Sequence, residues 1–195
     1  LAKDACKRDN YKLELMFIDC IKNKEHLEGK KIDCIWSSFT MTGRETQFLW
    51  AGPYLYSQQV VMVPKNSPIH SIKDLNGKIV GVQSTTKPED LLLRSGKDIP
   101  KIKEMIVFPT KSETVASFRE GGVDAVAGHI TALYRYTVQE NFRFLSDALE
   151  EVRLGVAFPK SGDKKLVGAL TNTLEDMKNE GLVDEIIQKY GLDPK

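Results

Sequence analysis

The stretch "KIVGVQSTTKPEDLLL", residues 78–93, contains the two alternating elements that decide the fold. Its first part is a short apolar run, which predicts a strand ending at Gln83. Its second part places Pro88 and two acidic residues where helices commonly begin. A strand that leads into a helix through a short polar loop is the repeating unit of α/β proteins.

The same alternation extends along the chain in both directions. We predict strands at 12–18, 32–38, 59–64, 78–83, 104–109, 124–128 and 152–159. We predict helices within 23–30, 71–77, 88–96, 112–122 and 130–139, and two more over 163–192, joined at 179–181. The sequence therefore predicts an α/β fold.

The order of these elements also predicts the domain organisation. The middle of the chain reads as a self-contained series of strands and helices, whereas the segments before and after it are each too small to bury a core alone. We therefore expect two lobes, one built from 1–58 with 152–195 and one inserted as 59–151. Two strands should cross between the lobes, near 56–61 and near 149–154.

The composition excludes several classes of protein. The 195 residues are 41% hydrophobic and 28% charged, which is typical of a globular protein and not of a disordered one. The net charge of +1 gives no support to nucleic acid as a partner. The chain has no GxSxG or HExxH motif, and its cysteines and histidines lack metal-ligand spacing. We therefore expect no catalytic residues, no metal and no cofactor.

A first polar loop, "SSFTMTGRE", occupies 37–45. If 32–36 is a buried parallel strand, the loop lies beyond its carboxyl end, where open α/β sheets bind ligands. The hydroxyls of Ser38 and Thr40 suit a charged head group, and Arg44 provides a planar fork for a carboxylate. The alternative is an ordinary loop leading from a strand into a helix.

A second polar loop contains Ser84, Thr85 and Thr86, directly before a predicted helix. A helix N-terminus offers unpaired N–H groups and a partial positive charge, so an anion can bind there. The loop lacks the GxxxxGK[ST] pattern of a phosphate-binding loop. The alternative interpretation is that Thr86 only caps the helix.

A third candidate is His129, which follows the predicted strand 124–128 and should lie at the same sheet end as the second loop. A structural role is the alternative for a lone histidine. The two polar loops fall in different predicted lobes. We therefore expect both to face one cleft and to hold one ligand.

The order of several segments resembles a known family, the extracellular solute-binding proteins of family 3, in the branch that binds polar amino acids. These are capture components of ABC importers. The resemblance covers essentially the whole chain and is carried by the segments "GKKIDCIWSSFTMTGRE", "WAGPYLYSQQVVMVPKNS", "SIKDLNGKIVGVQSTT", "GGVDAVAGH" and "VAFPKSGDKKLVGALTNTLEDMKNEGLVDEIIQKYGL".

The resemblance implies a two-lobed periplasmic-binding-protein fold of type II, which closes on a free amino acid. Ser38 and Thr40 would bind the ammonium and carboxylate groups of the amino acid. Arg44 would form a bidentate contact with its α-carboxylate, and Thr86 would add a further contact to the same carboxylate. The protein would be periplasmic or lipid-anchored and would deliver its ligand to ABC permease subunits. The ligand would be a polar amino acid such as glutamine, glutamate, cystine or a basic one.

The chain departs from the family pattern at four places. The family's opening strand is absent, and the chain starts within a helical pattern, which suggests that sequence precedes it. Cys20 stands where an aromatic ligand contact is usual, and His129 where an acidic residue binds the ammonium. Arg44 follows its threonine at a spacing one residue shorter than the commoner one. We therefore also consider His129 as a partner for a side-chain carboxylate of the ligand.

Two rival functions fit the same resemblance. One is a dehydratase similar to cyclohexadienyl dehydratase, with His129 or Glu45 as its acid or base. The other is the ligand-sensing ectodomain of a receptor.

Overall fold

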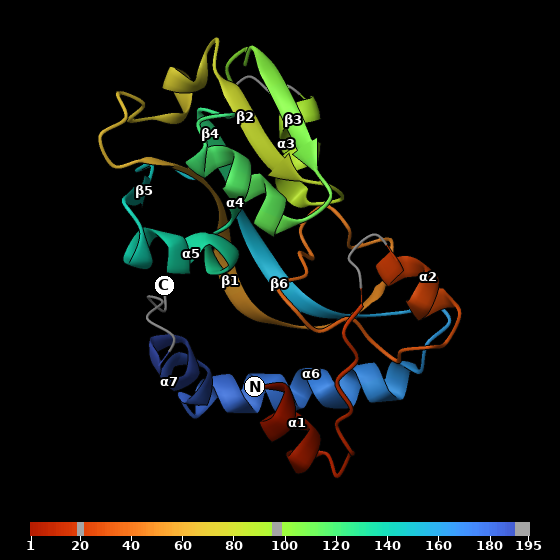
Figure 1. The fold of residues 1–195 in the computed structure, drawn as a ribbon. Helices are drawn as coiled ribbons and strands as arrows, with labels where there is room; N and C mark the ends of the chain where they lie inside the picture. The colour runs from red at the N-terminus through yellow and green to blue at the C-terminus, as the bar shows by residue number, and fades with distance from the viewer. Residues whose placement is uncertain (19–21, 95–98, 190–195) are drawn as a thin grey trace. The chain divides into compact units, whose positions relative to one another are not determined.

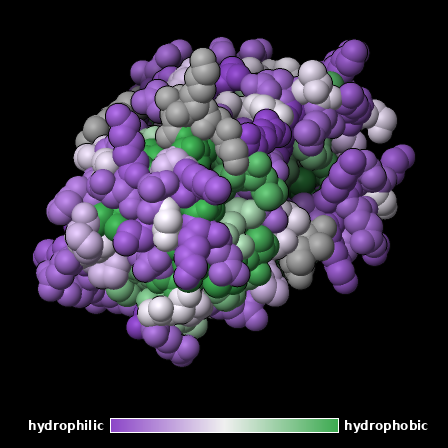
Figure 2. Space-filling view, turned by 90° about the horizontal axis from the view of Figure 1, so that it is seen from above, coloured by the Kyte–Doolittle hydropathy of each residue, from purple (hydrophilic) through white to green (hydrophobic). Residues whose placement is uncertain are grey.

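The computed structural model describes residues 1–18, 22–94 and 99–189. The chain forms two compact units, unit 1 from Leu1–Ser57 with Val152–Lys195, and unit 2 from Gln58–Glu151. Each unit has hydrophobic clusters made of its own residues. Figure 2 shows a surface on which hydrophilic residues predominate, with hydrophobic ones visible between them. The apolar side chains that stabilise the fold are therefore gathered inside each unit.

Within the described residues, six strands form one sheet, and five of them follow the order β3-β2-β4-β1-β5, with β6 paired to β1. Their bounds are β1 Leu49–Pro64, β2 Ile79–Gln83, β3 Glu104–Phe108, β4 Ala125–His129, β5 Phe142–Phe144 and β6 Glu150–Phe158. The strand β2 runs parallel to β3 and β4, whereas β1 runs antiparallel to β4 and β5. The boundary between the units falls within β1 and near the start of β6.

The helices of unit 2 cover both faces of its sheet (Figure 1). They are the 3-10 helix η2 Ile72–Leu75 and the α-helices α3 Lys87–Arg94, α4 Lys111–Arg119 and α5 Ile130–Gln139. Leu92 of α3 packs on one face, in the cluster that contains Val80 and Val82. Phe118 of α4 and Leu133 of α5 pack on the other. Because side chains alternate along a strand, the same strands supply both clusters.

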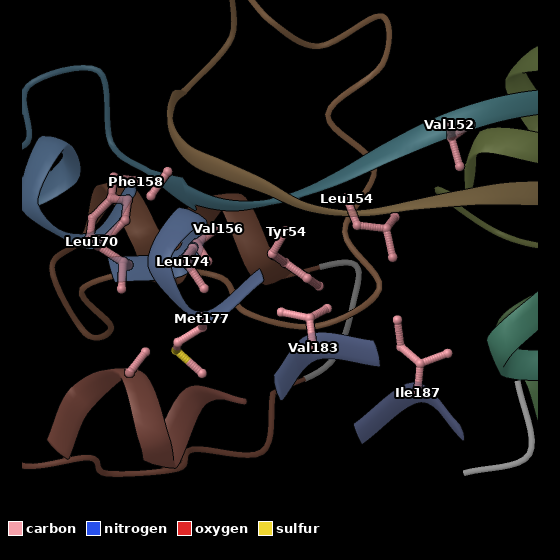
Figure 3. Close-up of a cluster of buried hydrophobic side chains, with 12 residues drawn as sticks. Tyr54, Val152, Leu154, Val156, Phe158, Leu170, Leu174, Met177, Val183 and Ile187 are labelled. Atoms are coloured by element: carbon pink, nitrogen blue, oxygen red, sulfur yellow. The ribbon is translucent and has the colours of Figure 1, made fainter. Parts of the chain in front are cut away.

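Unit 1 is organised around the long helix α6, Lys164–Asn179. The other helices of this unit are α1 Ala2–Arg8, α2 Asn23–Glu28 and α7 Leu182–Lys189. Leu170, Leu174 and Met177 lie on one face of α6, at a spacing of i, i+4 and i+7. Figure 3 shows this face directed at side chains of β6, with Val183 and Ile187 of α7 in the same cluster.

Two predicted strands are wrong. The segment 12–18 forms no strand, and Leu15 and Phe17 are 86% and 104% exposed. The segment 32–38 makes only an isolated antiparallel bridge, between Ile35 and Ala157. An apolar pattern makes a strand only where a neighbour satisfies the backbone, and in the described part of the chain 12–18 pairs with no strand.

One strand is longer than predicted and another was missed. The strand β1 begins at Leu49, whereas the sequence predicted a start at 59. Gly52 and Pro53 are typical of a turn, which hid the first half of this strand. The three-residue β5 gave no pattern long enough to detect. The other predicted strands, and the helices of unit 2 and of the tail, are confirmed with ends shifted by a few residues.

Candidate ligand-binding site

The first polar loop, 37–45, is held against the rest of unit 1 by hydrogen bonds. The Tyr54 hydroxyl donates to the Ser37 carbonyl oxygen, and the Arg153 backbone N–H donates to Thr42 Oγ1 at 2.9 Å. No helix begins in this loop. The loop therefore does not lead into a helix, and the prediction of a parallel strand before it is wrong.

Arg44 lies on an aromatic support. Its guanidinium carbon is 5.1 Å from the centroid of the Phe39 ring, and that ring stacks on Trp50 with 5.8 Å between centroids. Trp50 Nε1 donates to the Arg44 carbonyl oxygen at 3.2 Å, which fixes the backbone beside the side chain. A guanidinium lying over a ring directs its N–H groups sideways, where a planar carboxylate can accept two of them.

The two hydroxyl residues of this loop differ in exposure. Ser38 is exposed, whereas Thr40 is 4% exposed and forms a backbone bridge with Leu154. They flank Phe39, the ring beneath Arg44. The structure thus places three of the predicted ligand residues of unit 1, Ser38, Thr40 and Arg44, on one short, anchored loop.

Glu45, the acid considered for a dehydratase, is paired with Arg153. Its Oε1 lies 2.7 Å from Arg153 Nη2. Its own backbone N–H and the Arg153 guanidinium lower the pKa of the carboxyl group. A carboxylate held in its charged form is poorly suited to donate a proton at neutral pH.

The second polar loop, Ser84 to Thr86, connects β2 to α3 in unit 2. The Ser84 backbone N–H donates to the Phe108 carbonyl oxygen, and the Thr85 N–H donates to Glu89 Oε2 at 2.6 Å. The Thr86 hydroxyl donates to the Gln83 carbonyl oxygen at 2.6 Å. This bond differs from the side-chain cap that the alternative interpretation required. Thr85 has a φ of 61°, an uncommon conformation for a residue other than glycine.

His129 ends β4 and is the N-cap of α5. Its Nδ1 lies 2.7 Å from Thr131 Oγ1 and accepts from the Thr131 backbone N–H at 3.3 Å. Burial lowers the pKa of His129 to about 4, so the imidazole is neutral at pH 7. Because Nδ1 accepts, the proton is on Nε2. Nε2 is buried and has no hydrogen-bond partner among the described residues.

The second loop and His129 lie at the same end of the unit 2 sheet. Val82 pairs with Ala127 in the parallel ladder, and Ser84 and His129 are each two residues further along. By alternation His129 shares the face of Ala127 and Val82, on which Leu92 of α3 packs. The structure thus places the four residues predicted in this lobe at one end of the sheet: Ser84, Thr85, Thr86 and His129.

A buried ion pair that the sequence did not predict lies beside this loop. Lys87, the first residue of α3, is 6% exposed, and its Nζ is 3.2 Å from Glu150 Oε2. Glu150 Oε2 has no hydrogen-bond partner among the described residues. The contact with Lys87 is therefore an ion pair without a directed hydrogen bond. A lysine in the first turn of a helix is unfavourable, because its positive charge lies at the positive end of the helix dipole. In the sequence, this position of Lys87 is the signal that could have indicated an acidic partner.

Removing this lysine should destabilise unit 2. We expect Lys87→Met to lower the free energy of unfolding by about 2 kcal/mol, since Glu150 would keep an uncompensated charge but remains partly exposed. The double change with Glu150→Gln should recover most of that loss. Lys101→Met is the control, because Lys101 is exposed. Urea titrations of the unchanged protein and the three variants measure the free energy of unfolding. Equal losses of stability in Lys87→Met and Lys101→Met would contradict the prediction.

Cys20, also predicted as a ligand contact, lies outside the described residues. Within residues 1–18, 22–94 and 99–189, no three histidine, cysteine, aspartate or glutamate side chains gather as metal ligands would. In the same ranges no helix has the length and apolarity needed to cross a membrane.

The comparisons with known proteins identify the family. The chain matches the model of the bacterial extracellular solute-binding proteins, family 3, over residues 1–193. It belongs to this family, as the resemblance in the sequence indicated.

The relatives are binding proteins for amino acids. A probable histidine-binding protein of Neisseria gonorrhoeae is 30% identical over 145 residues, which cover 71% of this chain and 52% of the relative. The ABC transporter glutamine-binding protein GlnH of Bacillus subtilis is 23% identical, over 70% of this chain and 49% of the relative. This chain therefore spans about half the length of these two relatives.

A solved structure resembles the fold. The arginine-, lysine-, histidine-binding protein ArtJ of Geobacillus stearothermophilus has a TM-score of 0.84 and 25% identity, over 100% of this chain and 85% of that one. The predicted fold class, that of the periplasmic amino-acid-binding proteins, is confirmed.

Proposed function

We propose that this chain binds a polar amino acid outside the cytoplasmic membrane and delivers it to an ABC permease. The observation that carries the proposal is the placement of Arg44, a guanidinium supported by Phe39 on an anchored loop of a solute-binding protein. Relatives that bind histidine, glutamine, or arginine and lysine support the ligand class. The protein would be periplasmic or lipid-anchored.

In this proposal the charged groups of the amino acid are held by charge-assisted hydrogen bonds. Arg44 takes the α-carboxylate, Ser38 and Thr40 offer hydroxyls to the carboxylate and ammonium, and Thr86 completes the carboxylate's shell. Each hydrogen bond to a charged group contributes about 1.5–3 kcal/mol. Micromolar affinity corresponds to about 8 kcal/mol, so a few such contacts supply most of it.

Binding would act on the equilibrium between two conformations and would involve no chemical reaction. A ligand that makes more contacts in the closed state shifts the population toward it. Small-angle X-ray scattering with and without ligand measures this closure as a decrease in the radius of gyration. An unchanged radius at saturating ligand would contradict closure of the two units.

A thermal-shift screen of the twenty amino acids and cystine tests the ligand class. A ligand at a hundred times its Kd stabilises the protein by about 2.7 kcal/mol, which gives a clear shift in Tm. The Arg44→Lys variant should bind that ligand at least ten-fold more weakly, since an ammonium cannot replace the bidentate fork. Arg8→Lys is the control, because Arg8 pairs with Glu180 on the surface of unit 1.

The results of this screen, together with an activity assay, separate the proposal from the dehydratase. Failure of every amino acid to shift the Tm would overturn the proposed function. Turnover of prephenate or arogenate by the purified protein would instead support the dehydratase. The Glu45 carboxylate is paired with Arg153, which leaves it poorly suited to the role of a proton donor.

A further inference from the structure

We infer that His129 donates a hydrogen bond from Nε2 to a carboxylate on the side chain of the ligand, so that the ligand is an acidic amino acid. This inference rests on the proposed function and names the ligand class within it. It assigns His129 a role in specificity, whereas Arg44 takes the α-carboxylate.

The first argument is that the ring proton of His129 is on Nε2. Nδ1 accepts from the Thr131 backbone N–H, so the neutral ring can only donate from Nε2. Nδ1 faces the first turn of α5, and Nε2 is therefore on the side of the ring turned away from that helix. A buried donor without a partner destabilises a protein unless something accepts from it. An oxygen of the ligand would satisfy it.

The second argument is the set of groups around this end of the sheet. His129 is the N-cap of α5, and α3 begins four residues after β2, whose end lies at the same end of the sheet. Ser84 and Thr85 add hydroxyl groups at the same end of the sheet, whereas the Thr86 hydroxyl donates to the Gln83 carbonyl oxygen. Helix N-termini and hydroxyls favour an anion, and a bond to a charged acceptor is about twice as strong as one to a neutral acceptor. A carboxylate therefore fits better than an amide.

The third argument is against a ligand with a cationic side chain, because such a side chain would need a carboxylate of the protein near His129. Glu89 accepts from the Thr85 N–H, and Glu150 is paired with Lys87. Asp90 is two residues from Leu92 on α3, so it points away from the sheet face that Leu92 covers. Glu89 and Glu150 thus already have partners, and a ligand ammonium or guanidinium would have to compete with the Thr85 N–H and Lys87 for them.

Isothermal titration calorimetry with glutamate, aspartate, glutamine, arginine and lysine tests the inference. We expect glutamate or aspartate to bind at least ten-fold more tightly than the other three. In the His129→Asp variant this preference should be lost, because the new carboxylate repels that of the ligand. In His70→Gln, a change at an exposed histidine of the same unit, the preference should remain.

The outcomes distinguish this inference from the proposed function. Tightest binding of arginine, lysine or glutamine would overturn the inference and leave the proposed function in place. An unchanged preference in a folded His129→Asp variant, verified by circular dichroism, would also overturn it. Binding of none of the amino acids would overturn the proposed function itself.

Discussion

The Leu174→Ala variant is expected to lower the free energy of unfolding of unit 1 by about 2–5 kcal/mol. Leu174 is fully buried in α6, within the cluster that also contains Met177 and Val156. Figure 3 shows it among side chains that come from other elements of this unit. Alanine would lose apolar burial and leave a cavity that a close-packed interior fills only in part.

Urea denaturation followed by circular dichroism measures this loss. The control is Leu15→Ala, the same chemical change in the same unit, at a side chain that is 86% exposed. Its effect should stay within about 0.5 kcal/mol. Equal destabilisation by both variants would show that the α6 cluster is not the core of unit 1.

The sequence predicted unit 2 well because its local and tertiary signals agree. Its buried strands, such as β2 and β4, are continuous apolar runs with nonpolar neighbours on both faces. Its helices start at recognisable signals, such as the capping box of Thr110 and Glu113 on α4. Local pattern alone therefore located most elements of this unit.

The sequence predicted unit 1 less well because its strands depend on partners. Ile35 and Thr40 pair at single positions with β6, which is more than a hundred residues away. A local pattern cannot show which neighbour is available, so 12–18 and 32–38 looked alike. The cis Gly52–Pro53 segment of β1 hid a strand for the opposite reason, since its residues are typical of turns.

The candidate site, too, was predicted only where a local pattern carries the information. Residue types and order indicated Arg44, Thr86 and His129, because charged and hydroxyl groups after strands are recognisable in a sequence. The buried pair of Lys87 with Glu150 joins residues far apart in the chain. The tautomer of His129 depends on a hydrogen bond from the Thr131 backbone N–H, which residue types alone do not predict.

The stability of the protein is expected to fall by about 3 kcal/mol as the pH decreases from 6.5 to 4, because of His129. In the folded protein the pKa of this residue is lowered by burial from 6.5 to about 4. In this window the unfolded chain binds a proton that the folded protein does not bind. Stability therefore rises with pH from 4 to 6.5, and this contribution levels off about one pH unit above the unfolded pKa.

Urea titrations at half-unit steps of pH, on the unchanged protein and on His129→Gln, measure the effect as a difference in slope. Glutamine does not titrate, so the variant should lose much less stability between pH 6.5 and 4.5, whatever its stability at pH 7. Carboxylates with lowered pKa values, such as those of Glu140 and Asp147, lose their charge at lower pH and do so in both proteins. The exposed His70→Gln variant should keep the slope of the unchanged protein. Parallel pH profiles for His129→Gln and the unchanged protein would mean that the imidazole of His129 is not held in its neutral form by the fold.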